Sequence, residues 1–270
     1  MIANFPEFYE DELVYSALCR FYVHTVIGSR TAAKRLIYGD TTARIDPYSI
    51  GHIRKNIEEA MTRYVSRREL IIEHTMYPYL VTFEYSGKQL CERSLLGYKS
   101  SHGCGMLNKQ LRYCPICAKK EAEQYGESYY HRKHQLMTAC TIHHVMLNAV
   151  DVAIGKRQLV ALIPLEIVRT ESCIAADAED IRYSEYVEQF LSIPFSLRQK
   201  LNIQLIMRYL PHSIIEREKY NKYGSLDKKV QIWIKEKYKD IISLRCDAIL
   251  QLGYKLGISP EDLFIEPRRQ

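Results

Sequence analysis

The sequence lacks several features that would assign it to common classes of protein. It has no apolar run of 18 residues, as a transmembrane helix requires. Its first residues hold no basic stretch followed by an apolar one, as a secretory signal does. It contains no G-x-x-x-x-G-K-[ST] phosphate loop, no H-E-x-x-H motif and no carboxylate cluster for two-metal chemistry. We therefore predict a cytoplasmic protein that has no membrane partner and is not an enzyme.

Cysteine is what the sequence does contain, with eight residues in a chain of ordinary globular composition. Cytoplasmic cysteines serve as metal ligands or free thiols rather than as disulfides. Two short-spaced pairs suit a metal: Cys114 with Cys117, and Cys140 with His143, separated by residues 118–139. Each pair can hold one edge of a tetrahedron from a tight turn. We therefore predict one structural zinc ion with these four ligands and no open coordination position.

Two alternatives to this site stay open in the sequence. His144 directly follows His143 and can replace it as the fourth ligand. A second zinc ion would need His102 and Cys104, but no partner pair lies near them, so a second ion is not expected. The other cysteines also lack such pairs, and we predict that they are small buried hydrophobic residues: Cys19, Cys91, Cys104, Cys173 and Cys246.

Helical spacing of apolar residues predicts a mainly α protein in three regions. Residues 1–99 form a helical N-terminal region. Residues 100–150 form a central zinc-ribbon or zinc-finger module with short strands and one short helix. Residues 151–270 form a helical C-terminal region. In the first region the start and stop signals predict four helices: one after Glu10-Asp11-Glu12 that ends at Gly28, one over 31–38 that ends at Gly39, one opened by Asp46-Pro47, and one capped by Ser66.

The C-terminal region carries the net positive charge. From Ser196 onward there are 15 basic and 9 acidic residues, whereas the first 195 residues are neutral overall. This bias is compatible with contact to nucleic acid. Helices are predicted over 177–191, 197–210 and within 226–256. Residues 248–261 resemble a helix-turn-helix turn, but the second helix would be short and acidic. A helix that ends at Gly257 before another that starts at Ser259 is the preferred interpretation.

The segment between the two ligand pairs carries a dense motif. It reads Tyr-Gly-Glu-Ser-Tyr-Tyr-His-Arg-Lys-His-Gln over residues 125–135. His131 and His134 invite interpretation as a catalytic or metal pair, but no acidic cluster accompanies them. We expect Tyr129, Tyr130 and His131 to pack the module and Arg132 and Lys133 to face the solvent.

Taken together, the motifs resemble the TniQ/TnsD family of transposon target-selection proteins. Members of that family carry C-P-x-C, then Y-G-E-x-Y-W-H-R-x-H-Q, then C-x-x-H. The resemblance covers about residues 5–150, and Tyr130 stands where the family has tryptophan, so an aromatic residue is kept. The N-terminal matches are Phe5-Pro6, Asp11-Glu12-Leu13, Tyr15-Ser16, Arg20 and Thr75-Met76-Tyr77-Pro78.

The resemblance implies a function without cutting or joining of DNA. Family members mark an insertion site by binding target DNA, or a DNA-bound complex, and recruit an AAA+ ATPase that positions the transposase. The implied partners are the ATPase, target DNA, the transposase indirectly, and an RNA-guided CRISPR effector complex where targeting uses one. The implied location is the bacterial cytoplasm, on the nucleoid when DNA is bound.

Basic residues around the zinc module are the candidate DNA-binding residues, because phosphate contact needs only positive charge within reach: Arg112, Lys119, Lys120, Arg132 and Lys133. Glu121, Glu123 and Glu127 dilute this patch, so a solvent-facing or ATPase-facing role is the alternative for each. Two other functions also stay open. The first is a zinc-dependent transcription regulator without a transposition partner. The second is a zinc-assisted nuclease, which needs an open metal position and a general base.

Overall fold

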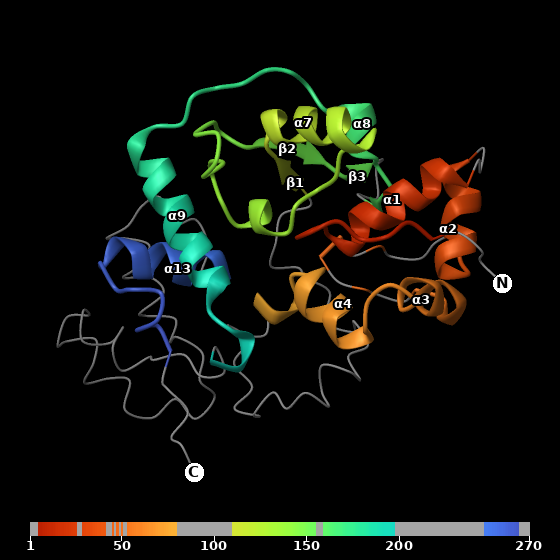
Figure 1. Cartoon of the computed structure of the whole chain (residues 1–270), viewed down its shortest axis with the longest axis horizontal. Coiled ribbons are helices and arrows are strands. Elements are labelled where there is room, and N and C mark those ends of the chain that lie inside the picture. The colour runs from red at the N-terminus through yellow and green to blue at the C-terminus, as the bar shows by residue number, and fades with distance from the viewer. Residues whose placement is uncertain are drawn as a thin grey trace, which may run out of the picture. The chain divides into compact units, whose positions relative to one another are not determined.

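The computed structural model of the protein describes residues 5–25, 29–41, 45, 47–48, 50, 53–79, 110–154, 159–197 and 246–264. These residues are mainly α-helical with a few short strands, which confirms the predicted fold class (Figure 1). The chain divides into two compact units, one of residues 1–77 and 92–181 and the other of residues 78–91 and 182–270. Within the described residues, no helix is both long and apolar enough to cross a lipid bilayer.

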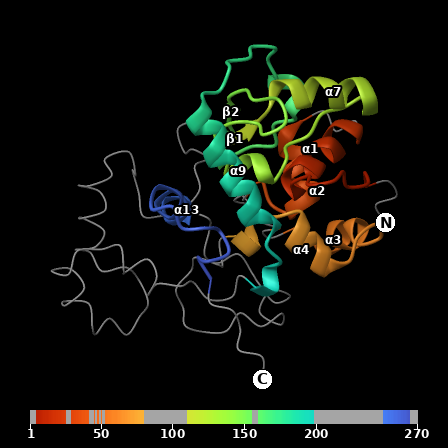
Figure 2. The same ribbon diagram turned by 60° about the vertical axis from the view of Figure 1, so that its left-hand side comes forward.

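Among the described residues, four helices build the N-terminal part of the first unit, and α1 lies beside α2 in both views (Figures 1 and 2). Ser29 caps α2 through its side chain, and Gly39 ends this helix with a φ of 80° that favours glycine. Ser66 and Glu69 form a capping box at the start of α4. The predictions for these two helices are thus confirmed. The four helices are α1 (Val14–His24), α2 (Arg30–Tyr38), α3 (Lys55–Met61) and α4 (Arg67–Glu73).

One predicted helix start was wrong, and at another the acidic residues do not have the role that was predicted. Helix α3 begins at Lys55, after Arg54, rather than at Asp46-Pro47. Helix α1 begins at Val14, and the acidic residues before it lie in a turn in which Asp11 has a φ of 56°. The carboxylates of Asp11 and Glu12 point to distant basic side chains instead of the helix end. Asp11 and Glu12 therefore form ion pairs with basic side chains and do not interact with the N-terminus of α1 as predicted.

Over residues 110–150, which the structure describes, the central module contains short strands and one α-helix, as predicted. Strand β1 (Gln110–Tyr113) pairs antiparallel with β2 (Asn148–Asp151), and Leu111 lies opposite Val150. Helix α7 (Pro115–Tyr125) follows β1 directly. The remaining elements of this part are η1 (Lys133–Gln135), β3 (Ala153–Ile154), β4 (Leu159–Val160) and α8 (Leu165–Val168).

Buried polar contacts join the N-terminal helices to the central motif. The backbone nitrogen of Leu13 donates to the carbonyl of Tyr130 at 3.0 Å, and the nitrogen of Tyr130 donates to Ser16 Oγ at 3.0 Å. The hydroxyl of Tyr130 donates to the carbonyl of Ile163 at 3.2 Å. Tyr130 is fully buried, so an aromatic side chain does pack at this position. The two regions therefore share one core rather than standing apart.

The second unit is described only in part. Aromatic rings connect its elements: Tyr183 and Tyr186 each lie 5.5 Å from Tyr254, measured between ring centroids. After α13, Gly257 adopts a φ of 67°, and residues 260–263 form turns rather than the start of a helix. The predicted new helix after Ser259 is thus not formed over these residues. The elements are α9 (Ala178–Ser192), which starts in the first unit, η2 (Phe195–Leu197) and α13 (Cys246–Lys255).

Several predictions fall outside the described residues. The predicted 197–210 helix and most of the predicted 226–256 helix lie there, as do Gly28, Cys91, His102 and Cys104. Helix α9 confirms the helix predicted over 177–191. Helix α13 confirms the end of the helix predicted within 226–256. Of the described cysteines outside the two pairs, Cys19 is buried as expected, but Cys173 is exposed.

Arg20 is the centre of a buried ion network in the first unit. Its guanidinium lies 2.6 Å from Glu12 and 2.7 Å from Glu127, and it also covers the ring of Tyr9 at 4.1 Å. Only 5% of the Arg20 side chain and none of the Glu12 side chain is exposed. Burial raises the pKa of Glu12 to about 7, although the charge of Arg20 acts to lower it. Arg20 therefore compensates a carboxyl group that has no access to solvent.

We expect Arg20→Met to lower the free energy of unfolding by about 3 kcal/mol, because it leaves Glu12 buried without its partner. Lys55→Met is the matched control, since Lys55 lies 3.6 Å from Glu59 in an exposed pair. Its loss should cost less than about 0.5 kcal/mol. Urea unfolding followed by circular dichroism measures both changes. Equal effects of the two substitutions would contradict the role of Arg20.

His131 bridges two carboxylates in the same unit. Its Nε2 lies 2.6 Å from Glu121 Oε1, and its Nδ1 lies 3.7 Å from Asp11 Oδ2. Burial of the ring favours the neutral form, yet the two carboxylates outweigh it and raise the pKa of His131 to about 9. The imidazolium thus holds the N-terminal turn at Asp11 against α7.

This raised pKa predicts a dependence of stability on pH. A histidine whose pKa is higher in the folded state stabilises the protein fully below its unfolded pKa of about 6.5, and this contribution is lost as pH rises through about 9. Between pH 6.5 and pH 9, the free energy of unfolding of the parent protein should therefore fall by up to about 3 kcal/mol more than that of His131→Gln. Urea unfolding at a series of pH values checks this. His24→Gln, which alters an exposed histidine beside Glu127, should follow the parent profile. If the free energy of unfolding varied with pH in the same way for the parent and for His131→Gln, this prediction would be refuted.

Candidate metal centre

The first ligand pair is held by the start of α7. Cys114 is the N-cap residue, and its sulfur accepts a hydrogen bond from the backbone nitrogen of Cys117 at 3.4 Å. Pro115 occupies the first helical turn, where its missing N–H costs nothing. The strand β1 ends at Tyr113, immediately before the pair. The strand-to-helix turn thus directs both sulfurs to the same side.

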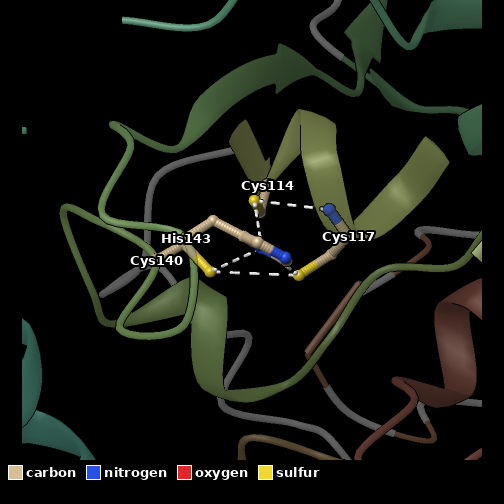
Figure 3. A group of neighbouring side chains, drawn as sticks. All are labelled: Cys114, Cys117, Cys140 and His143. Carbon is tan, nitrogen blue, oxygen red and sulfur yellow. Dashed lines mark hydrogen bonds between the residues drawn. The ribbon is translucent and has the colours of Figure 1, made fainter. Parts of the chain in front are cut away.

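The second pair sits in a tight turn between two short β-bridged segments. The nitrogen of Cys140 donates to the carbonyl of Val145, and the nitrogen of His144 donates to the carbonyl of Cys140, both at 2.8 Å. His144 takes a φ of 51°, which closes the turn and leaves its side chain exposed. The cluster therefore contains His143 rather than His144 (Figure 3).

The four donor atoms have the separations of a tetrahedral metal site. All lie within 4.8 Å of one another. His143 Nδ1 is 3.5 Å from Cys114 Sγ, 3.4 Å from Cys117 Sγ and 3.6 Å from Cys140 Sγ, and the last two sulfurs are 3.9 Å apart. A zinc tetrahedron has edges of about 3.5 Å between nitrogen and sulfur and about 3.8 Å between sulfurs. The four donors thus lie close enough together to hold a metal ion.

The thiols influence one another strongly. Hydrogen bonds from Cys114 and Cys117 lower the pKa of Cys140, so one thiolate forms readily in this group. Interactions with Cys114 and Cys140 raise the pKa of Cys117. For Cys114, the contact with Cys117 acts to lower the pKa, but Cys140 and burial raise it to about 11. A second and third thiolate at this distance would repel the first. Three thiolates can therefore coexist only around a cation, as zinc ligands do.

His134 supports the cluster from outside. It is buried, and its interaction with Cys140 helps to lower the pKa of that thiol. Burial in turn lowers the pKa of His134 itself. Partners of this kind orient the ligands of a metal site. Gln135 has a similar supporting role on β1, where its amide accepts from the nitrogen of Arg112 and donates to its carbonyl, both at 2.9 Å. The motif spacing did not reveal either role.

The five predicted DNA-binding residues differ in their exposure. Lys119 and Lys120 are exposed on α7. Arg112 is partly buried and donates to the carbonyl of Met137 at 2.6 Å. Lys133 is also partly buried. Arg132 does not face the solvent as expected, since 13% of its side chain is exposed and its guanidinium lies 3.2 Å from Asp11.

The two exposed lysines of α7 have different surroundings. Lys120 Nζ lies 2.8 Å from His143 Nε2, the ring nitrogen that faces away from the sulfurs. Lys119 instead lines a cleft of about 400 Å³ beside α8. Carboxylates share this cleft with Lys119 and Arg169, so its charge is mixed: Glu123, Glu166 and Glu171. Of the two lysines, Lys120 is thus the one associated with the metal centre.

Comparison with known proteins places these features in a family. The TniQ family model matches residues 3–147, more than half of the chain, and this span contains all four donor residues and the buried network around Arg20. Over 199 residues the chain is 26% identical to the transposon Tn7 transposition protein TnsD of Escherichia coli. That match covers 64% of this chain and 38% of the relative, so the chain spans well under half of the relative's length. The chain belongs to the TniQ family.

Proposed function

We propose that this protein is a target-site selection adaptor for DNA transposition. The observation that carries the proposal is the family match over residues 3–147, which encloses the metal centre and the motif packed beside it. The similarity to TnsD, which is named as a transposition protein of transposon Tn7, supports a role in transposition. In this role the protein marks an insertion site on the bacterial nucleoid by binding target DNA or a DNA-bound complex, which an RNA-guided CRISPR effector can supply.

The metal of the centre is one zinc ion with a structural role. Three cysteine sulfurs and one imidazole are a donor set that zinc prefers. The four protein donors complete a tetrahedron and leave no position for a reactive water. When bound, zinc supplies positive charge that lets the three thiolates coexist. The chain's own residues fix the start of α7 and the turn at 140–143 around it. The centre therefore suits an adaptor better than a nuclease.

Target DNA is the proposed ligand of the basic residues near the centre. Of Arg112, Lys119, Lys120, Arg132 and Lys133, the two exposed lysines are best placed to meet phosphate, because the other three are partly buried. The basic bias after Ser196 supports a further DNA contact by the C-terminal region. Phosphate contacts of this kind would position the protein on the duplex without reading its sequence.

An AAA+ ATPase is the proposed protein partner, and the transposase is reached through it. The N-terminal helices α1 to α4 are the proposed surface for this partner, because the family match includes them and the first 195 residues carry no net charge. A part of the chain without net charge suits a protein partner, whereas the basic part after Ser196 suits nucleic acid.

The purified protein should contain one zinc ion per chain. Cys117→Ser should lose the metal and unfold at lower urea concentration, because structural zinc contributes directly to the free energy of folding. Mass spectrometry of the metal content, in protein never exposed to a chelator, measures this. Cys173→Ser is the matched control, since Cys173 is exposed and outside the cluster. Full zinc content in folded Cys117→Ser would contradict the ligand assignment.

The adaptor role predicts simultaneous binding of DNA and the ATPase. DNA affinity of the full chain should fall steeply with salt, because counterions are released on binding. Replacing both Lys119 and Lys120 with methionine should reduce the slope of log affinity against log salt by about 2. Fluorescence anisotropy measures this, with Lys55→Met as the control.

A pull-down tests the protein partner. The full chain should retain the AAA+ ATPase of the same transposon in the presence of ATP and double-stranded DNA. If DNA binds and the ATPase does not, the adaptor role is wrong, and a zinc-dependent transcription regulator becomes the better account. Cleavage of plasmid DNA that persists through repurification would instead point to a nuclease.

A further inference from the structure

The imidazole of His143 has two differently placed nitrogens. Nδ1 faces the three cysteine sulfurs (Figure 3). Nε2 faces the other way and has the Lys120 ammonium nitrogen at 2.8 Å, in an exposed contact. One ring thus joins the metal centre to the basic surface of α7.

These two neighbouring groups are both hydrogen-bond donors once the centre holds its metal. With a cation on Nδ1, the neutral imidazole carries its proton on Nε2, and the lysine ammonium has donors only. Two donors cannot satisfy each other. A metal-bound histidine ordinarily donates this N–H to a carboxylate, a carbonyl or water. One acceptor that takes a hydrogen bond from both groups would satisfy the pair in this position.

We propose that the His143 Nε2–H and the Lys120 ammonium bind one phosphodiester oxygen of target DNA between them. This inference rests on the proposed function and adds a second role to a metal ligand. A phosphate oxygen accepts several hydrogen bonds and carries the charge that an ammonium prefers. The zinc-bound centre has a net charge of about −1 from three thiolates and one dication. Lys120 offsets this charge, which would otherwise repel the phosphate.

The same helix offers a comparison residue. Lys119 carries the same charge one position earlier, but it lines the cleft with Glu123 and Glu166 on the side of α8. It is exposed, as Lys120 is. Lys119 can therefore contact DNA, but it does not share an acceptor with His143. Only Lys120 should be coupled to the His143 ring.

His143→Cys separates the two roles of this residue. A fourth cysteine keeps a tetrahedral zinc site but removes the Nε2–H. In zinc-loaded full chain, we expect His143→Cys to lower the affinity for double-stranded DNA about tenfold, the effect of losing a hydrogen bond to a charged group. In a Lys120→Met background, His143→Cys should lower the DNA affinity by a further factor of less than about two. In a Lys119→Met background, the tenfold loss of DNA affinity should remain. The extra negative charge of the fourth thiolate acts in both backgrounds. A larger loss of affinity in the Lys119→Met background than in the Lys120→Met background therefore reports the acceptor that His143 shares with Lys120.

A second measurement does not depend on DNA. Inorganic phosphate, at constant ionic strength set with chloride, should shift the His143 Nε2–H resonance of zinc-loaded protein but not that of Lys120→Met. Equal losses in the two lysine backgrounds would overturn the shared site, and so would an unchanged affinity of zinc-loaded His143→Cys. A phosphate-induced shift in a parent protein that does not bind DNA would refute the proposed function while keeping the anion site. Absence of any shift would remove the site itself.

Discussion

Repulsion between three cysteine sulfurs is the constraint on which the central module depends. The sulfurs of Cys117 and Cys140 lie 3.9 Å apart, and the His143 nitrogen contacts all three sulfurs. The apolar cluster around them is small, with Cys114, Cys140 and Val145 buried and three further residues packed beside them. These contacts bring a strand end, a helix start and a tight turn together around the four donor atoms. A cation held by these four donors would add to the free energy of folding, because it would turn the repulsion among thiolates into ligation.

A second constraint joins segments more than a hundred residues apart. Asp11 and Glu12 are adjacent in the chain but serve different partners: Asp11 pairs with Arg132, and Glu12 pairs with Arg20. The positive φ of Asp11 makes this divergence possible, because it turns the chain between the two carboxylates. Glu127 completes the network from the central motif. The N-terminal and central motifs are therefore two halves of one buried ionic structure, and neither is a separate module.

The sequence predicted short-range features well and long-range ones poorly. The ligand pairs depend on residues two apart within a turn, so their spacing was enough to identify the cluster. Helices with a capping residue or a terminal glycine, such as Ser66 and Gly39, were predicted for the same reason. Arg132 was expected to face the solvent because its partner lies 121 residues away. His134 was missed as a support of Cys140, since nothing in the motif indicates which atom a buried ring meets.

Helix α7 is the element through which the two constraints act on each other. Its N-terminus holds Cys114 and Cys117, and its second turn places Glu121 against His131, which in turn faces Asp11. The charges along the helix run from Lys119 and Lys120 to Glu121 and Glu123, the reverse of the order that the helix dipole favours. Local helix stability does not account for this order, whereas the tertiary partners of Lys120 and Glu121 do. The middle of this helix is fixed by a buried imidazolium, and a metal bound at its N-terminus would fix that end too, so the helix has little freedom to rotate. The position of Lys120 at the surface is thus set from inside the protein, and this rigidity is what a phosphate contact beside His143 requires.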